Sequence, residues 1–205
     1  MAYFPFFVDL REKQGLIVGG GVIALRKIEK LLPFSPTLRV IAPEICPEIR
    51  EIPGLTLIER EFIPGDEADA FFVIAATDNA LCNRNVSALC REKNILVNAV
   101  DDAENCTFLF PALVQQGDLT VGISTGGSSP TAAICLKEQI RALVPESIDE
   151  ILTFLHEQRE EIKMREPDEK KRHVLLRKLF SAAMEKNGAL EDAEVAEVLQ
   201  EEEAL

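Results

Sequence analysis

The feature that most constrains the fold is a run of glycines between a predicted strand and a predicted helix. Gly19, Gly20 and Gly21 follow the apolar residues 16–18 and precede a helical pattern over residues 22–32. Gly19, Gly21 and Ala24 have the spacing G-x-G-x-x-A, in which the first glycine allows a tight turn and the second lets the backbone approach a pyrophosphate. The small third residue lets helix and strand pack closely. The run therefore predicts a dinucleotide-binding turn, with a purely structural turn as the alternative.

Short β-rich runs alternate with helical patterns up to residue 100. The runs cover residues 16–18, 38–42, 55–58, 71–76 and 95–100, and the best helical patterns cover 22–32 and 80–93. In the first helical pattern we expect an apolar face and an opposite polar face. The apolar face comprises Ala24, Leu25, Ile28, Leu31 and Leu32, and the polar face comprises Arg26, Lys27, Glu29 and Lys30. Continuous apolar strands joined by helices predict an α/β domain, a Rossmann-type doubly wound parallel sheet covered on both faces.

An acidic residue follows the second predicted strand. Glu44 lies 23 residues beyond Gly21 (44 − 21), close to the ~20 expected for a carboxylate that binds the adenosine ribose hydroxyls. A carboxylate there would repel the additional phosphate of NADP, which favours NAD as cofactor. The alternative is an ordinary exposed loop glutamate.

Polar residues follow two further predicted strands. Thr77 and Asp78 come after the fourth run. Asn98 lies near the end of the fifth run, and Asp101 and Asp102 follow it. Ligands of open α/β sheets bind beyond the carboxyl ends of the strands, so these residues are candidates for the nicotinamide and substrate side. The alternative is that the aspartates cap turns or helices.

The pattern changes after residue 106. Residues 107–114 and 119–124 read as two strands of a hairpin joined by residues 115–118, and a helix is predicted from Pro130 to about residue 143. Between hairpin and helix stand Thr125, Gly126, Gly127, Ser128 and Ser129. Backbone N–H groups, hydroxyls and a helix dipole could together hold a substrate carboxylate there, with Ser129 as N-cap. A structural turn is the alternative.

The remaining chain is charged and helical. Pro167 and Asn187-Gly188 separate three predicted helices, and Glu201, Glu202 and Glu203 read as a solvated helix end. We expect a Rossmann domain over residues 1–111, an α+β dimerisation segment over 112–145 and a helical domain over 146–205. A lone hairpin is marginally stable, so we expect its edges to pair with a second copy in a homodimer.

Composition excludes several classes of function. A net charge of −13 argues against nucleic acid as a partner, because phosphate binding needs a basic face. No apolar run approaches the ~20 residues of a membrane span. The five cysteines form no CxxC pair and there are two histidines, so we expect neither a disulfide framework nor a metal site. A cytoplasmic protein is expected.

The motifs together resemble one family. The segments are YFPFFVDL (from Tyr3), LIVGGGVIALRK (from Leu16), AATDNALCNRNV (from Ala75), NAVDD (from Asn98), FLFPALV (from Phe108) and ISTGGSSP (from Ile123). In order and spacing they resemble the precorrin-2 dehydrogenases, including the N-terminal modules of sirohaem synthases, over about residues 3–145. The turn at residues 32–36, LPFSP, departs from the glycine-containing turn of the family.

The resemblance implies NAD-dependent oxidation of precorrin-2, a tetrapyrrole, to sirohydrochlorin by a stand-alone, intertwined homodimer. It leaves open whether ferrous iron is also inserted. Carried over by position, nucleotide contacts fall on Gly21, Val22, Ile23, Pro43 and Glu44, and the key aspartate is Asp101.

A polycarboxylate substrate would be repelled by the net charge, so its site must gather local cations or N–H donors. The alternatives are a dehydrogenase for another small molecule and a non-catalytic NAD-sensing module. Asp101 and the 125–129 loop favour an enzyme.

Overall fold

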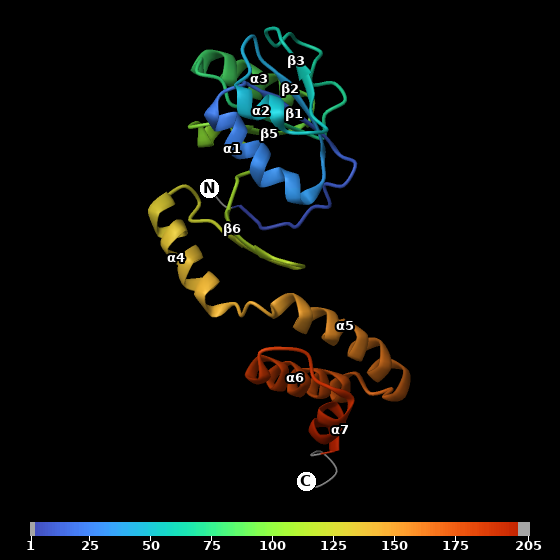
Figure 1. Cartoon of the computed structure of the whole chain (residues 1–205). Coiled ribbons are helices and arrows are strands. Elements are labelled where there is room, and N and C mark those ends of the chain that lie inside the picture. The colour runs from blue at the N-terminus through green and yellow to red at the C-terminus, as the bar shows by residue number, and fades with distance from the viewer. Residues whose placement is uncertain (1–2, 201–205) are drawn as a thin grey trace. The chain divides into compact units, whose positions relative to one another are not determined.

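The structure is a computed structural model that describes residues 3–200 (Figure 1). The chain divides into two compact units, residues 1–110 and residues 111–205. The predicted helix end at Glu201, Glu202 and Glu203 lies outside the described residues.

The first unit is built on a five-stranded parallel sheet. Its strands stand in the order β3-β2-β1-β4-β5, so the predicted Rossmann-type sheet is confirmed. The chain order reverses between the neighbours β1 and β4, and such a switch point opens a crevice at the carboxyl ends of the strands. The strands are β1 (Gln14–Val18), β2 (Thr37–Ile41), β3 (Thr56–Ile58), β4 (Phe72–Ala75) and β5 (Leu96–Ala99).

Two apolar clusters cover the two faces of this sheet. On one face, α1 (Val22–Leu31) and α2 (Pro47–Glu51) pack Ala24, Ile28 and Ile49 against the sheet residues Ile17 and Ile74. On the other, α3 (Ala80–Glu92) packs Val86 and Cys90 against strand residues such as Val73 and Val97. The strands are therefore apolar on both faces, which explains why they read as continuous apolar runs. The short α2 was not predicted from the sequence.

One residue of α1 was placed wrongly by the helical pattern. Lys27 is half-buried and does not lie on the solvent face. With Ala24, Ile28 and Leu31 it occupies positions i, i+3, i+4 and i+7, which form one stripe of a helix. Its side chain therefore points toward the covered face of the sheet, where Phe108 and Phe110 also pack.

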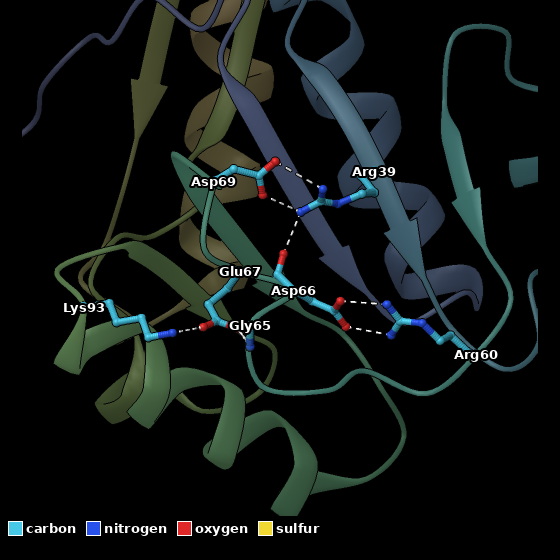
Figure 2. A network of polar contacts seen from close by, with 7 residues as sticks. All are labelled: Arg39, Arg60, Gly65, Asp66, Glu67, Asp69 and Lys93. Carbon is cyan, nitrogen blue, oxygen red and sulfur yellow. Dashed lines mark hydrogen bonds and ion pairs between the residues drawn. The ribbon is translucent and has the colours of Figure 1, made fainter.

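The crossover from β3 to β4 contains no helix and is held by ion pairs (Figure 2). Arg39 on β2 donates to Asp69 at 2.7 Å and to the Asp66 carbonyl at 2.6 Å. Arg60 pairs with the Asp66 carboxylate at 2.7 Å, and Lys93 pairs with the fully buried Glu67. Each of these cations has its carboxylate, so the cluster fixes the crossover.

The turn that departs from the family forms a short 3-10 helix, η1 (Leu32–Phe34). Ser35 follows with φ +53°, the left-handed conformation that glycine adopts most readily. Leu32, which was predicted on the apolar face of the first helix, is instead 39% exposed in this turn. The missing glycine is therefore accommodated locally.

The second unit begins with the predicted hairpin, in a shifted position. Its strands β6 (Ala112–Gln116) and β7 (Leu119–Ile123) are antiparallel and leave only Gly117 and Asp118 in the turn. The first strand does not begin at Thr107, because Thr107 instead bonds β5 through Val97 at 2.8 Å. Pro111, which has no N–H, separates the two pairings. A second 3-10 turn, η2 (Ala103–Asn105), precedes Thr107 in the first unit.

Four helices follow the hairpin in the described part of the second unit. α4 (Pro130–Leu143) begins after Ser129, which caps it as predicted, and the helix packs on the hairpin. The remaining helices are α5 (Ile148–Arg165), α6 (Glu169–Lys186) and α7 (Asp192–Gln200), packed around Ile151, Phe154 and Leu179. Pro167 and Asn187 separate them as predicted, and Asn187 ends α6 in the left-handed conformation.

Candidate active site

The first backbone N–H groups of α1, directly after the glycine turn, are open. The first helical bond of α1 runs from the Leu25 N–H to the Gly21 carbonyl at 3.0 Å, and no side chain caps the helix. The N–H groups of Val22, Ile23 and Ala24 are therefore left for a ligand at the positive end of the helix dipole. A Cβ added at Gly21 would meet no atom within 4 Å, so open space lies above the turn.

The other two glycines allow neighbouring segments to approach. Gly19 has φ +125°, and an added Cβ would lie 2.3 Å from the Ala76 carbonyl at the end of β4. An added Cβ at Gly20 would lie 2.2 Å from the Glu44 carbonyl. The Gly19 N–H also donates to Ile41 at 2.9 Å, and Cys46 donates to Gly20 at 2.8 Å. The structure thus brings the predicted nucleotide residue Glu44 directly against the turn, with Pro43 just before it and both side chains exposed.

Thr77 lies beside the same turn but is occupied by local bonds. Its N–H lies 3.1 Å from the position of a Cβ on Gly19. Its hydroxyl donates to Asn83 at 2.7 Å, and its carbonyl accepts from the Asn83 amide at 3.0 Å. Asn79, and not Asp78, caps α3. Both donors of Thr77 are therefore used, and its bonds hold the segment after β4 in place.

Asp101 stands on a loop that is fastened on both sides. It is exposed and has φ +59°, a left-handed conformation uncommon outside glycine. The Cys106 sulfur accepts from the Ala99 N–H at 3.2 Å, and Thr107 accepts from Val97 at 2.7 Å. Ser87 of α3 also donates to the Asn105 carbonyl. These contacts join the loop to β5 and α3 and leave the Asp101 carboxylate exposed beyond the carboxyl end of β5.

Asn98, predicted to contact substrate, is buried. It is 5% exposed, its amide nitrogen donates to the Phe108 carbonyl at 3.0 Å, and its oxygen accepts from the Lys27 ammonium at 3.3 Å. Lys27 is the residue that the sequence reasoning missed near this site. Its place in the buried stripe of the helix is the signal that could have identified it.

In the second unit, the predicted anion loop uses most of its own polar groups. The Thr125 hydroxyl accepts from the Ser129 N–H at 3.1 Å, and the Ser129 hydroxyl accepts from the Ala132 N–H at 3.2 Å. Gly126 donates to Ser124, and Ser128 donates through its N–H to Thr125. What remains for a ligand is chiefly the exposed Ser128 hydroxyl and the Gly127 N–H.

The comparisons with known proteins agree with this geometry. A family model described as "Putative NAD(P)-binding" matches residues 6–112. The chain belongs to this family. The match covers the parallel sheet, the glycine turn and the Asp101 loop, and it supports the prediction of NAD as cofactor.

Individual relatives extend the likeness along the chain. The siroheme synthase of Photorhabdus laumondii is 34% identical over 200 residues, which are 95% of this chain and 43% of that protein. The siroheme synthase of Sodalis glossinidius is 39% identical over 148 residues, which are 71% of this chain and 31% of that protein. The chain thus spans less than half the length of these relatives. A solved structure titled "SirC, precorrin-2 dehydrogenase" superposes with a TM-score of 0.73 at 27% identity, covering 99% of this chain and 100% of that one. The predicted family resemblance is therefore confirmed.

Residues 3–200 contain no candidate for a membrane span or for a metal centre. No helix there has the length and apolar character needed to cross a membrane. In the same residues no group of three or more His, Cys, Asp or Glu side chains is arranged to hold a metal ion.

Proposed function

We propose that this chain oxidises precorrin-2 to sirohydrochlorin with NAD as the hydride acceptor. The observation that carries the proposal is the match to SirC, a precorrin-2 dehydrogenase, over nearly the whole of both chains. The geometry of the first unit supports it, because an open glycine turn and an exposed carboxylate lie beyond the carboxyl ends of strands in one sheet.

The glycine turn fits a dinucleotide. The N–H groups of Val22, Ile23 and Ala24 would hold the pyrophosphate, and Gly21 leaves space for it. The exposed Glu44 would accept hydrogen bonds from the ribose hydroxyls. When bound, the nicotinamide supplies the hydride acceptor.

Asp101 is proposed as the base. The oxidation removes one hydride and one proton from the macrocycle, so the proton needs an acceptor near the nicotinamide. The carboxylate of Asp101 is exposed at the end of β5 and would accept that proton. The contacts of the loop hold this carboxylate in place, and a general base needs a fixed position relative to the proton that it accepts.

The test supplies precorrin-2 and either NAD or NADP, with air excluded so that the nucleotide is the sole oxidant. We expect NADH and the sirohydrochlorin spectrum to appear together, and calorimetric titration should show tighter binding of NAD than of NADP. Binding of NAD without turnover of precorrin-2 would favour a sensing module. Equal or tighter binding of NADP would remove the role assigned to Glu44.

We further propose that the protein is a cytoplasmic homodimer joined through the region from Pro111 to about Pro145. Two features support the dimer: β6 and β7 form a sheet of their own, and α4 leaves Ile134, Leu136 and Leu143 exposed by 45–79%. The five free cysteines fit a reducing compartment. Light scattering should give the mass of two chains, and Ile134→Glu should lower it. A monomer at micromolar concentration would end the dimer proposal.

A further inference from the structure

Lys27 is a half-buried cation close to the proposed base. Its ammonium lies 3.9 Å from the centre of the Phe110 ring and 3.3 Å from the Asn98 side-chain oxygen. Asn98 is the third residue of β5, three positions before Asp101. Lys27 therefore lies near the end of the strand that leads into the Asp101 loop.

Among the described residues, this cation has no carboxylate within ion-pair distance. Arg39, Arg60 and Lys93 each pair with a carboxylate (Figure 2). Within residues 3–200 no ion pair joins Lys27 to any carboxylate, although the chain has 35 acidic residues. The pKa of Lys27 is lowered to about 8, first by burial and then by the neighbouring Lys30, against the opposing effects of Cys106 and Asp101.

The surroundings orient Lys27 without neutralising it. The Asn98 amide nitrogen is held by the Phe108 carbonyl, so the Asn98 oxygen is turned toward the ammonium. An ammonium has three donors, and here one meets Asn98 while the aromatic ring faces the charge. A charge withdrawn from water without a counter-charge is held at a cost. Such groups are concentrated at functional sites.

We propose that Lys27 binds a carboxylate of the tetrapyrrole beside Asp101 and so determines which substrates are accepted. This inference rests on the proposed function. A chain of net charge −13 repels a polycarboxylate at long range. One oriented cation at the site would attract a substrate carboxylate at short range, where the local charge outweighs the net charge of the chain. Asn98 is then the positioning residue for Lys27 and need not touch substrate.

The test compares Lys27→Met and Lys27→Gln with the control Arg26→Gln. Arg26 is the exposed neighbour on α1, and its replacement removes the same charge. The probes are sirohydrochlorin for equilibrium binding, precorrin-2 for steady-state kinetics and NAD for calorimetry. Lys27→Gln keeps a donor for Asn98 and serves if Lys27→Met fails to fold.

Loss of a charge-assisted bond should raise KM for precorrin-2 and Kd for sirohydrochlorin by roughly tenfold or more in both Lys27 variants. NAD affinity and the values for Arg26→Gln should stay at wild-type levels. Unchanged KM and Kd in a folded Lys27 variant would overturn the inference, and so would an equal loss of NAD affinity, which would place Lys27 at the nucleotide phosphates. Failure of the wild type itself to bind sirohydrochlorin and to oxidise precorrin-2 would reject the proposed function instead.

Discussion

Two turns of this chain look alike in sequence and differ in structure. Both the turn at residues 19–21 and the turn at residues 124–129 are rich in glycine, follow a strand and open a helix. Around the first, no side chain caps α1 and the first N–H groups are open. In the second, Ser124, Thr125 and Ser129 accept hydrogen bonds from backbone N–H groups of the same segment.

The difference lies in the residue types beside the glycines. Hydroxyl side chains are good ligands for anions, but at a helix N-terminus they are equally good ligands for the backbone. Only donors that the turn does not use itself remain for a ligand. The first turn thus offers backbone N–H groups, and the second offers mainly Ser128 and Gly127.

Gly21→Asp should produce the largest effect. The backbone at Gly21 is extended, with φ −92° and ψ −172°, and its Cβ would meet open space, so the fold accepts the change. The new carboxylate would cap α1 and meet the pyrophosphate with like charge. We expect NAD binding to be lost while the melting temperature is unchanged or slightly higher. Calorimetry and thermal unfolding check this, with Gly21→Ala as the steric control; intact NAD binding would mean that the open donors do not hold the nucleotide.

Ser128→Glu should have a smaller and more selective effect. Ser128 is exposed, and its hydroxyl has no bond within the described loop, so a carboxylate there should repel a substrate carboxylate without disturbing the turn. We expect the Kd for sirohydrochlorin to rise by roughly tenfold, an energy of about 1.4 kcal/mol. NAD affinity should not change, and Ser128→Gln should lie between mutant and wild type. A parallel loss of NAD affinity would show that the loop belongs to the cofactor site or supports the fold.

Ser129→Ala should act on stability. The Ser129 hydroxyl accepts from Ala132 at 3.2 Å at the start of α4, and removing it leaves that N–H without its cap. Loss of an N-cap costs about 1 kcal/mol. Urea unfolding should show this decrease while NAD affinity stays constant. An unaltered unfolding midpoint would mean that the loop hydroxyls are not committed to the helix.

The same contrast between satisfied and unsatisfied groups predicts that stability depends on pH through Lys27. Burial first, and then Lys30, lower its pKa from 10.5 to about 8, against Cys106 and Asp101. Between these values the unfolded chain binds more protons than the folded chain, so folding becomes more favourable as the pH rises. The free energy of unfolding of the wild type, minus that of Lys27→Met, should therefore increase across this window. A difference that is independent of pH would mean that the ammonium is not desolvated.

The sequence predicted what local patterns determine. The apolar runs specified the parallel sheet, and the glycine spacing specified the turn after β1, because both depend on neighbours in the chain. Lys27 was misplaced because its charge was given more weight than its place in the apolar stripe of the helix, and because Phe108 and Phe110, which also pack on this face, return to the sheet from far along the sequence. The first strand of the hairpin was predicted to start at residue 107, too early, because β-rich composition does not show that Thr107 pairs with Val97. The use of the Thr125 and Ser129 hydroxyls within their own loop likewise depends on geometry that composition does not contain.

The most direct test of the central claim is NADH formation in a single turnover, with enzyme in excess over precorrin-2 and air excluded. We expect one NADH for each sirohydrochlorin that the wild type forms. Asp101→Asn should bind NAD and sirohydrochlorin normally and form NADH ~10²–10⁴ times more slowly, as expected for loss of a general base. Iron insertion, assayed separately on both proteins, shows whether the same carboxylate also serves a second reaction. Absence of NADH with the wild type, or a wild-type rate with Asp101→Asn, would contradict the account.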